Sequence, residues 1–200
     1  MKIILIILGI ALIAFVGIQL FALKSQQTIE TYPYTVLQKH ATFEIRSYQE
    51  TLFTSVKLPN IAYKNATGKG FSMLATYIFG GNEKNQKIAM TAPVAIQLQD
   101  SMTMMFMVPQ KLKKDSLPKP NQSNIKIKKE PAKTVAAIRF GGWANEKKIA
   151  IYKQKLQEAL HTEGIAFTNR FYFFGYNAPY EVFNRKNEII VELQTASREK

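Results

Sequence analysis

The sequence of 200 residues contains no cysteine and only two histidines. Without cysteine, the chain cannot form disulfides, iron–sulfur clusters, thiolate zinc sites or a thiol nucleophile. Acidic residues are also few, 14 against 27 lysines and arginines, which gives a formal net charge of +13. This charge favours anionic partners, although scattered lysines also serve solubility. Nucleophile–base pairs and metal-ligand clusters do not occur at recognisable spacing, so we expect neither an enzyme nor a metal site.

One long stretch lacks charge altogether. Residues 3–23 read IILIILGIALIAFVGIQLFAL, in which Gln19 is the only strongly polar side chain. About twenty apolar residues suffice for a helix to cross the hydrocarbon core of a bilayer. We therefore expect a single-pass membrane helix, with residues 1–24 as the anchor and residues 25–200 as one further domain.

A cleaved signal peptide is the alternative for this stretch. Signal peptides have a shorter apolar core and small residues before the cleavage site, whereas here Ala22 follows the bulky Leu20 by two positions. The uncleaved anchor is therefore the favoured interpretation. Lys2 and the amino terminus nearly balance Lys24 and Lys39, so charge hardly sets the orientation. Because Lys2 begins the chain, we expect the domain outside the cytoplasm.

Hydrophobic periodicity after the anchor predicts an α+β domain. A helix from Ile61 to Phe79 would place Tyr63, Thr67, Phe71, Leu74 and Ile78 on one face. A second helix would begin after an Asn145 cap and end at Glu163-Gly164. Strands are expected over residues 43–48, 51–58, 87–98, 101–109, 134–142, 167–177 and 187–194, with a short strand near 125–127 inside a lysine-rich and proline-rich loop (109–133).

Two features of the middle strands call for interpretation. Pro93 cannot donate to a sheet, so it predicts an edge position or a bulge. The methionines at 102, 104, 105 and 107 could suggest metal ligands. They alternate along a strand, however, and a strand buried on both faces explains them with core packing alone.

A short phrase occurs twice: Tyr77-x-Phe79-Gly80-x-Asn82 and Tyr172-x-Phe174-Gly175-x-Asn177. Each half of the domain would then run strand, helix, phrase and strand. We interpret this as two pseudo-repeats that form a distorted β-barrel with two packed α-helices, preceded by the membrane helix. A ligand cleft between such halves is expected.

The chain resembles the SOUL haem-binding protein family. The stretches that carry the resemblance are ETYPYTVL (30–37), FEIRSY (43–48), YIFGGNEKNQKIAMTAPV (77–94), IRFGGWA (138–144) and GYNAP…NRKNEI (175–189). It implies a distorted barrel of two pseudo-repeats, in which Pro93 kinks a strand. It also implies non-enzymatic binding of haem or another tetrapyrrole. The alternative is an interaction or effector-sensing module for a different amphipathic ligand, because such domains are similar in fold.

The resemblance implies two routes to haem. In one, a histidine ligates iron, and this chain has Ser47 at that position. In the other, the ring lies along the first helix, and Thr76 replaces a lysine of that route. We expect an apolar wall with lysines near the ring carboxylates, so that iron contributes little; the predicted cofactor-binding residues are Phe71, Leu74, Ala75, Ile78, Lys64, Lys69 and Lys87.

The two histidines and the lysine-rich loop have plainer explanations. His161 would be an exposed cation at a helix end, and His40 precedes the first predicted strand. Aromatic residues are not interleaved with the lysines of residues 109–133, so we expect no nucleic-acid partner. The expected partners are an amphipathic tetrapyrrole and, through residues 3–23, a membrane.

Overall fold

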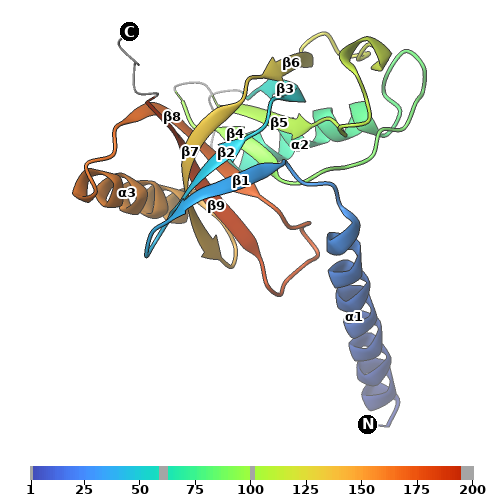
Figure 1. Cartoon of the computed structure of the whole chain (residues 1–200). Coiled ribbons are helices and arrows are strands. Elements are labelled where there is room, and N and C mark those ends of the chain that lie inside the picture. Colours follow the sequence, from blue (N-terminus) through green and yellow to red (C-terminus); the bar gives the residue numbers. More distant parts are fainter. Residues whose placement is uncertain (1, 59–62, 100–101, 195–200) are drawn as a thin grey trace, which may run out of the picture.

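The computed structural model describes residues 2–58, 63–99 and 102–194 of the chain (Figure 1). The predicted helix start at Ile61 and the turn around Asp100 lie outside these residues. The elements in chain order are α1 (Lys2–Thr28), β1 (Tyr34–Lys39), β2 (Glu44–Tyr48), β3 (Thr51–Lys57), α2 (Tyr63–Ile78), β4 (Val94–Gln97), β5 (Thr103–Met107), the 3₁₀ turn η1 (Lys114–Ser116), β6 (Lys126–Glu130), β7 (Lys133–Gly141), α3 (Glu146–Thr162), β8 (Phe167–Gly175) and β9 (Lys186–Leu193).

The N-terminal helix α1 projects away from the rest of the molecule (Figure 1). Its segment Lys2–Gln19 is long and apolar enough to cross a membrane by length and composition, a test that a signal sequence would also pass. The helix continues to Thr28, beyond the predicted boundary at residue 24. The division of the chain at that boundary stays a prediction.

The nine strands of the described residues form one antiparallel, curled sheet in the order β1-β2-β7-β9-β8-β4-β5-β3-β6. From β2 to β6 this order shows internal two-fold symmetry. Each half contributes two strands, a helix and two strands, and β4 pairs with β8 at the centre. The first strand of each half pairs with the second strand of the other half. The predicted α+β fold, a barrel-like sheet of two pseudo-repeats with two packed helices, is confirmed.

The repeated phrase, however, does not mark equivalent positions. Gly80 follows the end of α2, whereas Gly175 ends strand β8. In the paired centre of the sheet, Gly175 lies opposite Val94, so β8 corresponds to β4 rather than to the segment after α2. The expectation that the phrase occupies the same place between helix and strand in each half is therefore wrong, because helix C-termini and strand ends both accommodate glycine beside aromatic residues.

The two glycines therefore predict different mutational effects. Gly80 has a φ of +115°, whereas the φ of Gly175 is not in the positive region. Gly80→Ala should lower the free energy of unfolding by about 1–3 kcal/mol, because a Cβ strains that backbone conformation. Gly175→Ala should change it by less than about 0.5 kcal/mol. Thermal melting of both variants checks this, and equal losses would contradict the assignment.

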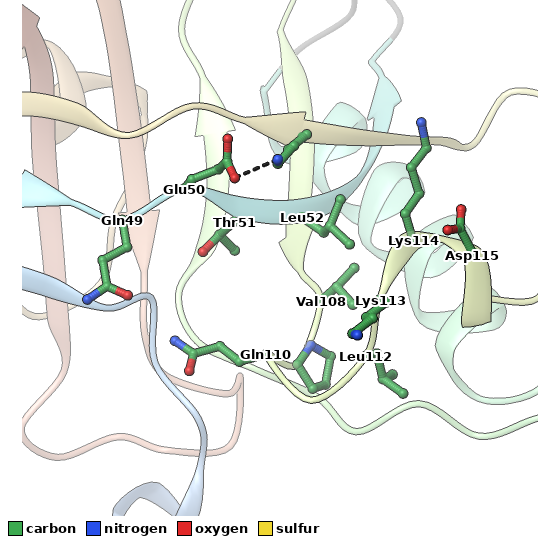
Figure 2. Close-up of a pocket in the computed structure, with 12 residues that line it drawn as sticks. Gln49, Glu50, Thr51, Leu52, Val108, Gln110, Leu112, Lys113, Lys114 and Asp115 are labelled. Carbon is green, nitrogen blue, oxygen red and sulfur yellow. Dashed lines mark ion pairs between the residues drawn. The ribbon is translucent and has the colours of Figure 1, made fainter.

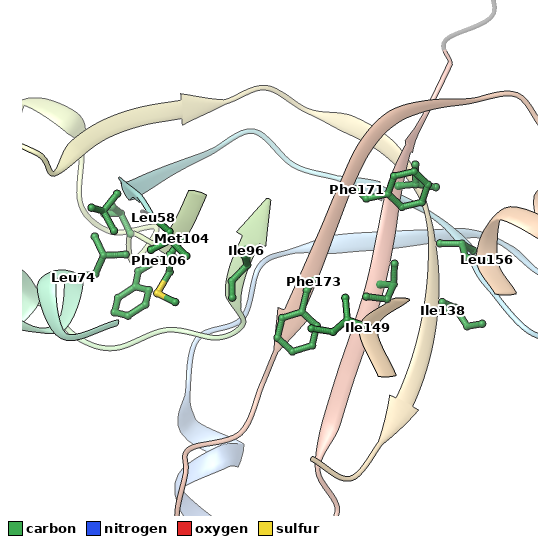
Figure 3. Packing of buried hydrophobic residues seen from close by; sticks show 14 of the residues in the cluster. Leu58, Leu74, Ile96, Met104, Phe106, Ile138, Ile149, Leu156, Phe171 and Phe173 are labelled. Atoms are coloured by element: carbon green, nitrogen blue, oxygen red, sulfur yellow. The ribbon is translucent and has the colours of Figure 1, made fainter. Parts of the chain in front are cut away.

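The core has two layers, one on each side of the sheet. The helix-side layer receives Leu74, Ile78, Ile149, Leu156 and Leu160 from α2 and α3. Figure 3 shows one cluster around Leu74, Met104 and Phe106 and another around Leu156 and Phe171, with Ile96 between them. On the opposite side lies a second layer, here called the aromatic face: Tyr32, Tyr48, Phe53, Ala95, Met105, Met107, Val135, Ala137, Tyr172, Phe174 and Ile190.

Strand β5 confirms the interpretation of the methionines. Met104 belongs to the helix-side layer, and Met105 and Met107 belong to the aromatic face. The segment before it differs from the prediction, because the strand expected over residues 87–98 begins only at Val94, after a cis Ala92-Pro93 bond. The residues before Pro93 instead pair with the linker that follows α1: Ala92 accepts from the Tyr32 amide and donates to Glu30. Strand β1 precedes the first predicted strand, residues 43–48, and was not expected.

Candidate functional site

Helix α2 carries the residues predicted to contact a ligand. Gly70 lets the helix approach the end of β3, since a Cβ there would lie 2.2 Å from the Leu58 side chain. Leu74, Tyr77 and Ile78 are buried on the face toward the sheet. The Tyr77 hydroxyl donates to the Pro118 carbonyl at 2.9 Å. These contacts set which side of α2 remains accessible.

The structure places the predicted site residues in different environments. Leu74 and Ile78 are core residues, so the surface that remains for a ligand excludes them. Phe71 and Ala75 lie at the edge of the buried face, and the Phe71 ring contacts Phe106 edge-on at 5.3 Å. Lys64 lies in α2, among residues whose side chains are not described. Whether any of these residues binds a ligand stays a prediction.

The accessible apolar part of α2 is a line of three residues spaced by four, here called the α2 stripe: Phe71, Ala75 and Phe79. The Phe79 amide donates to the Ala75 carbonyl at 2.9 Å, so Phe79 continues the helical geometry past Ile78. Residues four apart lie on the same side of a helix. Phe71 is 38% exposed and Phe79 is 62% exposed. Phe79 was absent from the predicted site, although its spacing from Phe71 and Ala75 could have identified it.

Two described lysines lie near this stripe, in different relations to it. Lys87 is exposed and forms an isolated bridge with Phe79, so its backbone lies beside the end of the stripe. Lys69 is also exposed, but it lies two residues before Phe71 and so points to another side of α2. The stripe therefore has one described cation at its C-terminal end.

Both histidines lie at the α3 end of the molecule rather than at the α2 stripe. The His40 ring stacks on Phe43 at 4.2 Å, and its Nδ1 lies 3.7 Å from a Glu163 carboxylate oxygen. His161 is in the last turn of α3, as predicted, with its ring edge-on to Phe167. Among the described residues, groups of three or more histidine, cysteine or acidic side chains that could hold a metal do not occur.

On the other side of the sheet, the aromatic face surrounds a buried ion pair. Arg46 on β2 donates to both carboxylate oxygens of Glu188 on β9, at 3.0 and 3.2 Å. The Tyr176 hydroxyl donates to the same carboxylate at 2.7 Å, and Lys186 lies 3.2 Å from it. Arg46 also pairs with Glu44 at 2.9 Å. The pair joins β2 of the first half to β9 of the second half through a bidentate, charge-assisted hydrogen-bonded contact, which is stronger than a hydrogen bond between neutral groups.

The electrostatics of this pair follow from burial and partners. Burial raises the pKa of Glu188, but hydrogen bonds and charge from Arg46 outweigh burial, and the net pKa lies below its usual value. For Arg46, burial lowers the pKa, and the Glu188 contacts raise it more. The pair therefore stays ionised although Glu188 is completely buried.

A second network lies further along β9. Lys133 lies 2.9 Å from Glu130 and 3.0 Å from Glu192, and the Tyr172 hydroxyl donates to Glu192 at 2.6 Å. Burial and this hydrogen bond raise the pKa of Tyr172. A hollow of about 560 Å³ beside these groups is also lined by Ser47. Most charged and polar groups of the two networks have their hydrogen-bond and ion-pair partners within the same network, so the networks hold strands of the sheet together.

One signal in the sequence could have revealed these networks. Strand β9 reads KNEIIVEL, in which Glu188 and Glu192 interrupt an apolar run with a spacing of four. Acids in a strand buried on both faces need cationic partners. Tyr32, from the linker after α1, covers the same face; its hydroxyl is buried without a partner among the described residues, and burial raises its pKa.

A separate hollow of about 510 Å³ lies between the start of β3 and the segment 108–115 (Figure 2). Leu52, Val108 and Leu112 form its apolar lining. Glu50 and Lys129 form an ion pair of 2.6 Å at its rim, where Lys113 and Lys114 also lie. These lysines belong to the lysine-rich loop of residues 109–133.

Comparison with known proteins gives a consistent result. The family model described as SOUL heme-binding protein matches residues 29–192. Heme-binding protein 2 of Homo sapiens is 30% identical over 157 residues, which cover 74% of this chain and 76% of the relative. Heme-binding protein 1 of Bos taurus is 26% identical over 174 residues, which cover 81% of this chain and 91% of the relative.

Solved structures share the fold at much lower identity. The C-terminal domain of EcmrR aligns with a TM-score of 0.58 and 13% identity over 81% of this chain and 98% of that domain. A hydrolase from Listeria innocua aligns with a TM-score of 0.52 and 10% identity over 79% of this chain and 94% of that one. At these identities the likeness describes the architecture alone.

Proposed function

The chain belongs to the SOUL haem-binding protein family, and on this premise we propose that it binds haem or a related tetrapyrrole without catalysing a reaction. Relatives named heme-binding proteins support the ligand class. The observation that supports a site is the α2 stripe, where Phe71 and Phe79 expose aromatic surface on the helix that the family resemblance indicates. A flat apolar ring would cover this surface.

The binding chemistry that we propose has two parts. The ring face packs on Phe71, Ala75 and Phe79, which gains roughly 25 cal/mol per Å² of apolar area before ordering costs. The ring carboxylates face Lys87 and, by its spacing of seven residues from Phe71 in α2, Lys64, whereas Lys69 lies on another side of the helix. Each exposed lysine adds at most about 1 kcal/mol. Leu74 and Ile78 contribute indirectly, because they hold α2 on the sheet.

The residues at the stripe fit a tetrapyrrole ring better than they fit its iron. Phe71, Ala75 and Phe79 offer no ligand atom, and both histidines lie by α3. We therefore propose that iron contributes little to affinity, so protoporphyrin should bind about as tightly as haemin. A much tighter haemin complex would indicate an axial ligand elsewhere, and His40 would be the first residue to replace.

The test is a titration of the full chain in lipid nanodiscs with haemin and with protoporphyrin, followed by absorption and fluorescence quenching. Phe79→Ser should weaken both ligands about 10-fold or more, because it removes about 1.5–3 kcal/mol of buried aromatic surface. Ile151→Ser is the matched control, since Ile151 is an exposed apolar residue on α3, the counterpart of α2 in the other half. The proposed site would be overturned if Phe79→Ser and Ile151→Ser weakened ligand binding equally, or if the wild type showed no saturable binding.

We also propose that α1 tethers this domain to a membrane as a single-pass helix, with the domain outside the cytoplasm. The support is the uncharged run before Lys24 and the exposure of nearly all its described side chains. The full chain should stay in the membrane pellet after carbonate extraction, whereas a chain that begins at Thr28 should be released. Release of both would contradict the tether. Proteolysis of sealed vesicles tests the side on which the domain lies.

A further inference from the structure

The connection between β8 and β9, residues 176–185, contacts helix α1 directly. The Gln19 side chain donates from Nε2 to the Tyr180 carbonyl at 3.0 Å and accepts at Oε1 from the Val182 amide at 3.3 Å. The Phe183 ring lies edge-on to Phe15 with centroids 6.4 Å apart. Figure 1 shows this connection beside the domain end of α1. These contacts join segments more than 160 positions apart.

These contacts account for the one strongly polar side chain in the apolar run. An amide side chain inside a bilayer needs hydrogen-bond partners, and so do the backbone groups of any segment that enters it. Gln19 is buried, and its amide satisfies a carbonyl and an N–H of the connection. Gln19 and the backbone of the β8–β9 connection thus supply hydrogen-bond partners to each other.

The connection also exposes apolar and aromatic side chains that the domain leaves uncovered. Tyr180 is 53% exposed, Phe183 is 58% exposed and Val182 is 39% exposed. Trp143, after β7, is 55% exposed, and the Arg185 guanidinium lies 3.9 Å above its ring. Tryptophan and tyrosine concentrate at the boundary between lipid headgroups and acyl chains. We call Trp143, Tyr180, Val182 and Phe183 the interfacial cluster.

The depth of this cluster follows from α1. The uncharged run ends at Leu23, directly before Lys24, and Phe15 lies eight residues before Leu23. At 1.5 Å per residue, Phe15 lies about 12 Å along the helix from the end of that run. A side chain in contact with Phe15 therefore lies close to the depth of about 5–10 Å that interfacial segments reach, and a tilt of the helix lessens the difference.

We propose that the interfacial cluster is a second membrane contact, embedded at the surface of the same bilayer that α1 crosses. This inference rests on the proposed tether and adds that the domain is held against the lipid in one orientation. The partner is the phospholipid bilayer. Arg139 lines a hollow of about 670 Å³ with Val182, Phe183 and Arg185, and its guanidinium has no hydrogen-bond or ion-pair partner within the described part of the chain. It would face the headgroup phosphates.

The sole tryptophan makes the proposal measurable. The full chain is reconstituted into vesicles of phosphatidylcholine brominated near the headgroup end of the acyl chains, and tryptophan emission is compared with that in unbrominated vesicles. Trp143 should lose much of its emission. A Trp143→Phe, Phe183→Trp double variant should lose more, because position 183 lies nearer α1. Flotation of the vesicles establishes separately that the chain is bound.

Gln19→Leu provides the matched variant. It makes α1 more apolar, so the chain should float with the vesicles as before, but it removes both hydrogen bonds to the connection, so quenching should fall. Unquenched emission from a chain that floats would overturn the interfacial contact and leave the tether intact. Failure to float would instead overturn the tether. Unchanged quenching in Gln19→Leu would show that Gln19 does not position the cluster.

Discussion

Arg46→Met should lower the free energy of unfolding by about 3–5 kcal/mol, the cost of leaving a buried carboxylate without its partner. Glu188 is fully buried, and both of its oxygens accept from Arg46. Tyr176 and Lys186 would still contact the carboxylate, but neither reproduces the bidentate contact of Arg46. For a domain of this size, the melting temperature should fall by roughly 6–20 °C.

The matched control is Arg139→Met. Arg139 lies on β7 opposite Glu188 in the strand register, but its side chain is exposed and forms no ion pair with the carboxylate in the described part of the chain. It should change stability by less than about 0.5 kcal/mol. The double variant Arg46→Met, Glu188→Met should recover most of the loss, because two apolar side chains can replace a buried pair. A double variant as unstable as Arg46→Met would contradict this explanation.

The pH dependence of the free energy of unfolding has a definite sign. In the wild type, the lowered pKa of Glu188 contributes stability that is present above the unfolded pKa and is lost as the pH falls through the folded pKa. In Arg46→Met, burial without Arg46 should raise that pKa, so Glu188 can become neutral in the folded state. The difference between the two proteins should therefore begin to shrink above the unfolded pKa of about 4, where Glu188 of the folded variant takes up a proton, and should shrink further below it, where the wild type loses its stabilisation. A constant difference would point to lost packing instead.

Leu74→Ala should destabilise the domain by about 2–5 kcal/mol, because it leaves a cavity between α2 and the sheet. Leu74 has no exposed surface, and it packs in the cluster with Met104 and Phe106 (Figure 3). Phe79→Ala, on the same side of the molecule, should cost less than about 0.5 kcal/mol, because the ring is largely exposed. Melting temperatures of the two variants separate core residues from surface residues.

Binding should show the opposite ranking. Phe79→Ala should weaken protoporphyrin about 10-fold, whereas Leu74→Ala, measured below its melting temperature, should bind within about threefold of the wild type. Weaker binding in Leu74→Ala alone would mean that the ligand opens the core face of α2. A small loss of stability in Leu74→Ala would mean that this face is less tightly packed than the structure indicates.

Several elements followed from local chemistry. The periodicity of residues 146–162 and the Asn145 cap predict α3, and the Asn145 side chain indeed accepts from the Lys148 amide at 2.9 Å. Alternation in residues 102–108 predicts a strand buried on both faces, as β5 is. An uncharged run of about twenty residues predicts α1. In each case the residues that predict the element are close together in sequence, and their spacing decides which face of the helix or strand each side chain occupies.

Other predictions failed or were incomplete because the deciding partner is distant in sequence. The phrase around Gly80 and Gly175 looked equivalent, but the pairing of β8 with β4 places only one of them in a strand. The wall of α2 looked continuous from Phe71 to Ile78, but contact with β3 and β5 buries part of it and leaves Phe79 accessible. A helical wheel shows that a face is apolar, not which surface covers it.

The family, the α+β class, both packed helices, the apolar helix and the basic charge follow from the amino-acid sequence, because these depend on composition, short-range spacing and similarity. The three-dimensional arrangement was needed to establish that Arg46 and Glu188 pair, that Gln19 contacts the β8–β9 connection, and that Leu74 is core while Phe79 is surface. Each of these depends on two segments brought together by strand order. The free energy of such contacts comes from burial and from partners in space, and neither is specified by the neighbours of a residue along the chain.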